Sequence, residues 1–311
     1  MRHLDFHRLK TYSIKKRRNL AKSGMFGSVP SPGCSAAKLI ASLPDTGAAA
    51  SLRAVADAVA KARARNRPVL AAMGAHVVKC GLGPTLIDLM KRGFLTGLAV
   101  NGALAIHDYE LSLIGATSED VATGLRDGSF GMGRETADAF VRAAARSKDG
   151  VGLGRALGEL ILADKNPNAK LSLLAQARKL DIPVTVHVAI GTDIVHMHPD
   201  VSGAELGEGT MLDFRALCGL VGGLEGGVWL NIGSAVVMPE VFLKALTVAR
   251  NLGRKVERFT AANFDMLRHY RPQQNVLDRP GGKAYAVTGH HEILLPLLRV
   301  AILEAAGKKR R

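Results

Sequence analysis

Apolar residues recur along most of this chain at helical spacing, and short apolar runs separate the helical stretches. A helix is predicted over residues 51–65, where apolar side chains return every three or four positions and Pro68 ends the pattern. The apolar run at 68–73 is too short for a helix and predicts a buried strand. By the same criteria we predict further helices at 84–92, 103–114, 170–180, 239–252 and 292–306, and further strands at 95–100, 182–189, 228–232, 256–261 and 284–288.

Strands that alternate with helices are typical of an α/β fold. We therefore predict a mostly parallel sheet of about six strands with helices on both faces. Residues 116–165 show helical patterns and turns but no strand, which indicates a helical insertion. In such sheets ligands bind beyond the carboxyl ends of the strands, at the point where the strand order reverses. Functional residues are therefore expected where the predicted strands end.

Charge divides the 311-residue chain into three parts. Of the net charge of +15, +7 lies in residues 1–22 and +4 in residues 308–311, so the body between them is nearly neutral. We interpret 1–35 as a basic flexible arm, 36–307 as a single α/β domain and 308–311 as a basic tail. Basic ends on a neutral body do not favour nucleic-acid binding.

Hydropathy and the number of cysteines bear on where in the cell the protein is expected. No apolar run reaches the length of about 18 residues that spans a bilayer, and the basic start lacks the apolar stretch of a secretory signal. Cys34, Cys80 and Cys218 are few and far apart, which argues against a disulfide framework. We therefore expect a cytoplasmic protein with no membrane partner.

Polar and ionisable residues gather where the predicted strands end. Imidazoles suit proton transfer near neutral pH, and carboxylates suit cationic substrates. The candidates after successive strands are Gly74, then Asn101, Gly102, His107, Asp108 and Glu110, then Asp193, His196 and His198, then Gly233 and Ser234, and finally Asn263 and Asp265.

The run from Asn231 to Ser234 is the best phosphate candidate, because it joins a predicted strand directly to a helix. Its backbone N–H groups and the helix dipole can face an anion. The chain has no Walker sequence, which argues against kinase or ATPase chemistry, and no G-x-S-x-G nucleophile turn.

Short runs in a fixed order resemble the deoxyhypusine synthases over residues 66–115 and 170–303. The matching runs are His76-Val-Val-Lys-Cys80, Arg92-Gly93, Asn101-Gly102, Ile182-Pro-Val184, Gly233-Ser-Ala-Val-Val237, Arg271-Pro272, Lys283-Ala-Tyr-Ala286 and Leu294-Leu-Pro-Leu-Leu298. The resemblance implies a Rossmann-like sheet, a homotetramer and bound NAD. It also implies chemistry in which a hydride leaves spermidine and an aminobutyl group is transferred. The family's reactive lysine stands in a Trp-Gly-Lys run after Arg-Pro, and neither its Trp nor its Lys follows Arg271-Pro272 here.

The leading hypothesis is an NAD-dependent transferase that acts on a polyamine or related small amine without a covalent lysine intermediate. His107 and His196 would move protons, and Asp108, Glu110, Asp193 and His198 would bind the substrate. Gly74, Asn101, Gly102, Gly233, Ser234, Asn263 and Asp265 would contact NAD. This hypothesis requires no metal.

Two alternatives remain open from the sequence. A metal-dependent hydrolase on the same scaffold would use His107, Asp108, His196 and His198, whose imidazoles and carboxylate suit zinc or iron. A non-catalytic homologue that keeps a ligand-binding role is the other alternative.

Overall fold

The computed structural model describes residues 3–307. Its strands are β1 (Val69–Met73), β2 (Gly97–Asn101), β3 (Val184–His187), β4 (Val228–Ile232), β5 (Thr260–Asp265) and β6 (Lys283–Thr288). They form one six-stranded parallel sheet in the order β3-β2-β1-β4-β5-β6. The predicted α/β fold is therefore confirmed. The strand order reverses between β1 and β4, which is the switch point of a Rossmann-like sheet.

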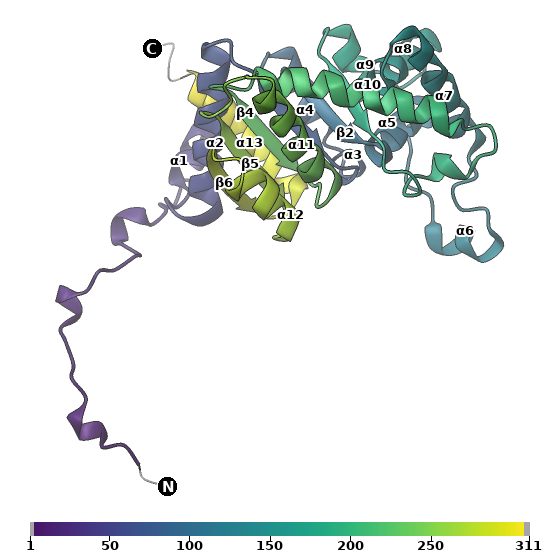
Figure 1. Cartoon of the computed structure of the whole chain (residues 1–311). Coiled ribbons are helices and arrows are strands. Elements are labelled where there is room, and N and C mark those ends of the chain that lie inside the picture. The colour runs from purple at the N-terminus through teal and green to yellow at the C-terminus, as the bar shows by residue number, and fades with distance from the viewer. Residues whose placement is uncertain (1–2, 308–311) are drawn as a thin grey trace.

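Helices cover both faces of the sheet (Figure 1). They are α1 (Ala36–Ser42), α2 (Gly47–Ala64), α3 (His76–Lys79), α4 (Gly83–Lys91), α5 (Gly102–Ile114), α6 (Val121–Asp127), α7 (Arg134–Ala145), α8 (Leu153–Ala163), α9 (Leu173–Lys179), α10 (Gly203–Gly222), α11 (Val237–Asn251), α12 (Tyr270–Pro272) and α13 (His291–Gly307). Single turns are η1 (Phe6–Arg8), η2 (Ile14–Lys16), η3 (Ser23–Met25), η4 (Arg146–Asp149) and η5 (Ile194–Met197), and η6 (Gln273–Asp278) is a π-helix.

Alternate residues of each strand enter two separate cores, as a sheet with two covered faces requires. In β1, Val69, Ala71 and Met73 pack with α2, α4 and α13, whereas Leu70 and Ala72 pack with α10 and α11. The predicted helical segment at 116–165 contains α6, α7, η4 and α8, and it holds no strand.

The prediction for β5 was displaced by four residues. The apolar residues Val256 and Phe259 suggested a strand at 256–261, but the strand runs from Thr260 to Asp265. The Glu225 carboxylate accepts hydrogen bonds from the backbone N–H groups of Glu257 and Arg258, which holds this stretch outside the sheet. Asn263 and Asp265 therefore belong to β5 itself and do not follow it.

Helix α10 was not predicted, because its five glycines weaken the helical pattern between residues 203 and 222. It lies along the free edge of β3. Thr210 Oγ1 donates to the carbonyl of Val186, and the Val186 N–H donates to Asp213. Side chains of α10 thus satisfy backbone groups that an edge strand leaves unpaired.

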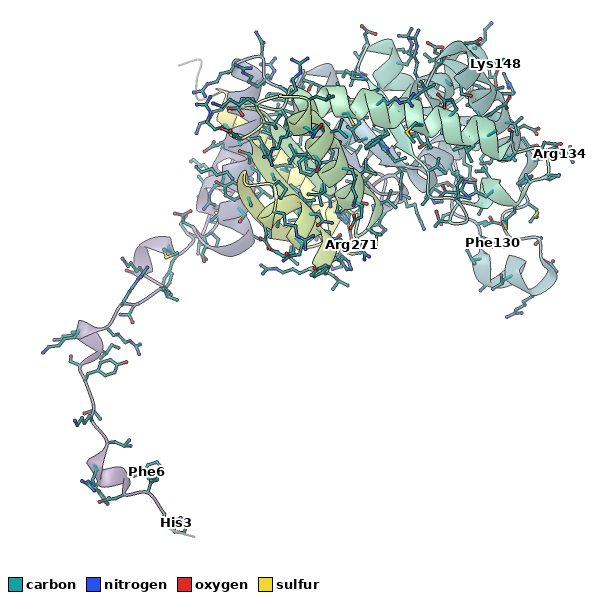
Figure 2. The ribbon with its side chains drawn as sticks, viewed as in Figure 1. His3, Phe6, Phe130, Arg134, Lys148 and Arg271 are labelled. Atoms are coloured by element: carbon teal, nitrogen blue, oxygen red, sulfur yellow. The ribbon has the colours of Figure 1, made fainter. Side chains whose placement is uncertain are left out.

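The N-terminal segment extends away from the body of the protein (Figure 1), and Figure 2 places His3 and Phe6 at its far end. Its turns η1, η2 and η3 contain no buried residue. Two backbone hydrogen bonds, Ser28 N–H to Ser42 and Asp45 N–H to Met25, fasten its inner end beside α1. The basic tail proposed at 308–311, like residues 1–2 of the arm, lies outside the described residues. No helix within residues 3–307 combines the length and the apolar character needed to cross a membrane.

Candidate functional site

Two glycines meet at the switch point of the sheet. Gly74 follows β1 and Gly233 follows β4, and a Cβ atom on Gly74 would lie 2.2 Å from the Gly233 carbonyl oxygen. Gly233 also has a φ of +62°, a conformation that favours glycine. The two backbones therefore approach without an intervening side chain, and their N–H groups bond the carbonyls of Ile232 and Phe264.

A network of hydrogen-bonded polar residues lies next to Gly233. The Asn231 side-chain amide donates to the carbonyl of Ser234 at 2.9 Å and to Asn263 Oδ1 at 2.7 Å. Ser234 Oγ accepts from the N–H of Met238, in the first turn of the 15-residue helix α11. Hydrogen bonds thus fix Ser234 just after β4 and Asn263 beside it in β5. Ser234 lies next to a helix N-terminus, which favours negative charge.

A second group of predicted residues lies at the ends of β2 and β3. The Asn101 side chain accepts from Leu104 N–H and caps α5. The Asp193 carboxylate lies against the same helix end, since a Cβ on Gly102 would sit 2.0 Å from its Oδ2. Burial raises the pKa of Asp193, while the neighbouring His196 and Thr192 oppose that rise.

His107 and Glu110 lie on one face of α5 and share the hydroxyl of Thr117. Thr117 donates to Glu110 Oε2 at 2.5 Å, so it accepts from His107 Nδ1 at 2.6 Å. A neutral His107 then keeps the lone pair of Nε2 free to accept a proton. Burial alone would raise the pKa of Glu110, but contacts with His107 and Thr117 hold it below its usual value.

The two histidines of the loop after β3 are held by the backbone. His196 Nδ1 accepts from the N–H groups of Gly191 and Asp193, so the ring proton is on Nε2. That Nε2 is buried and has no partner among residues 3–307. His198 Nε2 contacts the carbonyl of Gly131 at 3.1 Å.

Asp108 has a different position from its neighbours on α5. Its side chain is fully buried, and it accepts hydrogen bonds from Ser172 Oγ and from the N–H groups of Leu173 and Leu174. It therefore fastens the N-terminus of α9 inside the protein, and we do not carry it into a substrate or metal site. Asp265, at the end of β5, accepts from Leu267 N–H and lies 3.9 Å from His269 Nε2.

The four residues of the metal-hydrolase alternative are not brought together. Asp108 is buried under α9, His107 faces Thr117, and the loop histidines make the contacts described above. Among residues 3–307, the three side chains whose ligand atoms do converge are His76, Cys80 and Glu292. The His76–Cys80 spacing of four residues signals this pair in the sequence, but Glu292 is far away along the chain.

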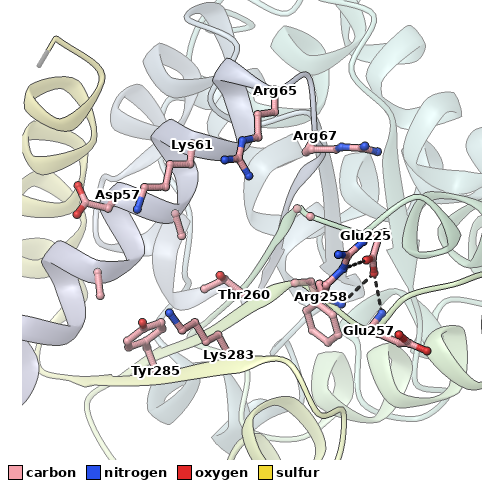
Figure 3. Close-up of a pocket in the computed structure, with 15 residues that line it drawn as sticks. Asp57, Lys61, Arg65, Arg67, Glu225, Glu257, Arg258, Thr260, Lys283 and Tyr285 are labelled. Atoms are coloured by element: carbon pink, nitrogen blue, oxygen red, sulfur yellow. Dashed lines mark hydrogen bonds and ion pairs between the residues drawn. The ribbon is translucent and has the colours of Figure 1, made fainter. Parts of the chain in front are cut away.

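The largest cavity described lies at the opposite, amino edge of the sheet (Figure 3). It measures about 920 Å³ and is open, and the starts of β5 and β6 line it. Its charged lining residues are Asp57, Lys61, Arg65, Arg67, Glu225, Glu257, Arg258 and Lys283. Size therefore points to one edge of the sheet, whereas the clustered imidazoles and carboxylates lie at the other. We favour the carboxyl edge because open charged hollows are commonly solvated, and strand ends at a switch point bind ligands.

Comparisons with known proteins give a fold-level relation. No protein-family model matches the chain, and no curated protein matches it in sequence. A crystal structure of a conserved protein assigned as LOR/SDH from Methanococcus maripaludis S2 has a TM-score of 0.54 at 15% identity, over 83% of this chain and 70% of that one. The ternary complex of AgrE with ornithine and NAD+ has a TM-score of 0.54 at 15% identity, over 81% of this chain.

A protein assigned as a deoxyhypusine synthase from Entamoeba histolytica has a TM-score of 0.53 at 10% identity, over 87% of this chain and 94% of that one. The present chain spans only 33% of the AgrE chain. At such low identities these likenesses establish a shared fold, and the Rossmann-like α/β scaffold is the conclusion they support.

Proposed function

We propose that this chain is an NAD-dependent enzyme that removes a hydride from a small amine, such as a polyamine, and passes the resulting imine carbon to a second amine. The observation that carries the proposal is the contact of Gly74 with Gly233 at the switch point, beside the N-terminus of α11. The structural neighbours add support, because one is a complex with ornithine and NAD+ and another is assigned as a deoxyhypusine synthase.

The residues at the switch point fit a dinucleotide. Gly74 and Gly233 let the ends of β1 and β4 approach each other closely at the switch point, and Ser234 lies where α11 begins, whose N-terminus favours a phosphate. Asn101 ends β2, the strand that in such folds carries the residue contacting the ribose. Gly102, Asn263 and Asp265 are the remaining residues proposed to contact NAD. Asn263 accepts a hydrogen bond from the Asn231 side chain. NAD bound there would supply the hydride acceptor.

The cluster at the ends of β2 and β3 fits a cationic substrate. Contacts with His107 and Thr117 hold the pKa of Glu110 below its usual value and favour its charged form, and Asp193 adds a second carboxyl group whose pKa burial raises. His107 offers a free Nε2 lone pair, and His196 and His198 lie on the neighbouring loop. As the carbon–hydrogen electron pair leaves with the hydride, the amine becomes an iminium ion. His107 could take the proton that the second amine loses as it adds to the iminium carbon and return it to the nitrogen of the first amine, which then leaves.

This chemistry proceeds without a lysine intermediate from this chain. Lys283 is the lysine nearest in sequence to the expected place, but it begins β6 and lines the cavity at the amino edge. At about 3.3 Å per residue, a six-residue strand puts it roughly 17 Å from the carboxyl edge. Direct attack by the acceptor amine is therefore the proposed route. A homotetramer belongs to the same proposal, and light scattering of the purified protein tests it.

A charge placed at Ser234 should interfere with NAD binding. In Ser234→Asp the carboxylate can still accept from Met238 N–H, because Asp is a good capping residue, but it repels the phosphates. We expect the Kd for NAD, measured by calorimetry on protein freed of dinucleotide, to rise at least about 10-fold, or 1.4 kcal/mol. The side chain in Ser234→Asn has nearly the same shape as that in Ser234→Asp but no charge. The Kd of this control for NAD should therefore stay within about threefold of the wild-type value.

A variant at the amino edge of the sheet tests whether NAD binds at the carboxyl edge. Arg65→Ala changes the amino-edge cavity and should leave the Kd unchanged. Loss of binding in Arg65→Ala together with normal binding in Ser234→Asp would move the dinucleotide to that cavity. Absence of NAD binding by the wild type would reject the proposed function. Where NAD binds, amines are then screened for NAD reduction by absorbance.

A further inference from the structure

His76, Cys80 and Glu292 form a compact group of three ligand atoms. Each pair of these atoms lies within 4.8 Å, and Cys80 Sγ is 3.1 Å from His76 Nε2. His76 begins α3 and Cys80 follows its end, so one helical turn puts both side chains on the same face. Glu292 comes from the first turn of α13, which follows β6. We infer that this group is a binding site for a divalent transition-metal ion, zinc by preference.

The donor set selects the kind of metal. Zinc takes a thiolate, an imidazole and a carboxylate in tetrahedral geometry, whereas calcium and magnesium prefer oxygen donors. Zn–S and Zn–N bonds of about 2.3 and 2.1 Å place sulfur and nitrogen roughly 3.6 Å apart in a tetrahedron. The His76–Cys80 pair would therefore open by roughly 0.5 Å on binding, a shift within the reach of side-chain rotation.

The surroundings hold one ligand in place. His291 is 1% exposed and packs edge-on against His76, with ring centroids 5.5 Å apart. Its Nε2 contacts the carbonyl of Phe264 at 3.1 Å, which fixes the ring. Because His291 cannot move freely, it restricts the orientation of His76, as neighbouring groups do in metal sites.

Convergence of all three atoms distinguishes a metal site from a Cys–His–Glu nucleophile. In a catalytic triad the carboxylate lies on the far side of the imidazole from the sulfur, with hydrogen bonds on both ring nitrogens. Across a ring, those bonds separate sulfur and carboxylate by roughly 7 Å or more. Here the Glu292 oxygen lies within 4.8 Å of Cys80 Sγ as well as of His76.

Three protein ligands leave a fourth position open, which is typical of catalytic zinc and not of closed structural sites. The Glu292 side chain is 49% exposed, so water or a nitrogen or oxygen donor from a substrate can reach this position. His76 is two residues from Gly74, and His291 lies over Gly233. The metal would therefore stand beside the switch point. The inference does not depend on NAD binding there.

Cobalt titration of the full-length protein without an affinity tag tests the site. After removal of metal with EDTA, added Co²⁺ should produce a thiolate-to-cobalt absorption band that saturates at one ion per chain. Cys80→Ser should abolish the band, whereas Cys34→Ser and Cys218→Ser, which change the other two thiols, should keep it. The histidines of the N-terminal arm cannot produce this band, because it requires a thiolate.

Glu292→Gln provides a second variant that should fold normally, because Glu292 lies at the surface. We expect its Co²⁺ affinity to fall at least about 10-fold, and zinc should displace cobalt from the wild type. Absence of the band in the wild type, or its persistence in Cys80→Ser, would overturn the inference. Rapid alkylation of Cys80 without a cobalt band would also overturn it and would indicate a nucleophilic thiol. Each readout is taken without NAD, so failure of the dinucleotide proposal leaves the result interpretable.

Discussion

Replacing Asp108 with Ala is expected to lower the free energy of unfolding by roughly 3–5 kcal/mol. The carboxylate accepts from Ser172 Oγ at 2.5 Å, Leu173 N–H at 2.6 Å and Leu174 N–H at 3.2 Å, in a place without solvent. Alanine leaves two backbone donors of α9 buried and unpaired, in addition to a cavity. Urea unfolding at pH 7.5, followed by circular dichroism, measures the change.

Asp108→Asn is the matched control for this substitution. It keeps the volume of the side chain and one acceptor oxygen, so its loss should be clearly smaller than that of alanine. Glu110→Ala, two residues along the same helix at a half-buried position, should cost less still. An alanine variant within about 1 kcal/mol of the wild type would contradict the capping role.

Asp213 should contribute a fall in stability as the pH rises from 5 to 8. Burial raises the pKa of this carboxyl to about 7, although hydrogen bonds from Val186 N–H and Gly154 N–H oppose the rise. At pH 5 the folded protein therefore holds a proton that the unfolded chain, with an Asp pKa near 3.9, has largely released. The unfolded state binds fewer protons, so raising the pH through 7 removes roughly 2–3 kcal/mol of stability.

Asp213→Asn isolates this contribution. Asparagine resembles the protonated carboxyl, and one oxygen can accept from both N–H groups, since both donate to Oδ2. The stability of the wild type relative to Asp213→Asn should therefore drop by roughly 2–3 kcal/mol between pH 5 and pH 8. Asp181→Asn, at a side chain that is 98% exposed, should leave the pH dependence unchanged. Parallel pH profiles for the wild type and Asp213→Asn would contradict the raised pKa.

Much of the fold follows from local patterns. β4 was predicted at its observed bounds, and β1 and β6 within one residue, because short apolar runs between helices have few other solutions. β5 was misplaced because hydrophobicity at Val256 and Phe259 reports burial, and burial also occurs in a loop that Glu225 holds. α10 was missed because its stability comes from packing along β3 and not from helix propensity.

The sequence predicts which edge of the sheet carries the candidate site, but it does not predict which residues touch one another there. The strand ends placed Gly74 and Gly233 at one edge, yet their backbone contact depends on β1 and β4 being neighbours. Asp108 and Glu110 looked alike in sequence. The packing of α9 buries one, while Thr117 and Thr136 hold the other half-buried. Glu292 reaches Cys80 only because the chain returns through β6, and one sequence carries no sign of that meeting.

The covering of β3 by α10 limits how copies of this protein can aggregate. A sheet with two bare edges can grow without end, since each added chain offers a new edge to the next. Here Thr210 and Asp213 occupy main-chain groups of β3, so among residues 3–307 β6 is the outer strand whose far side pairs with no other strand. Pairing through a single free edge joins two chains and then stops, which yields a closed pair and not a fibre.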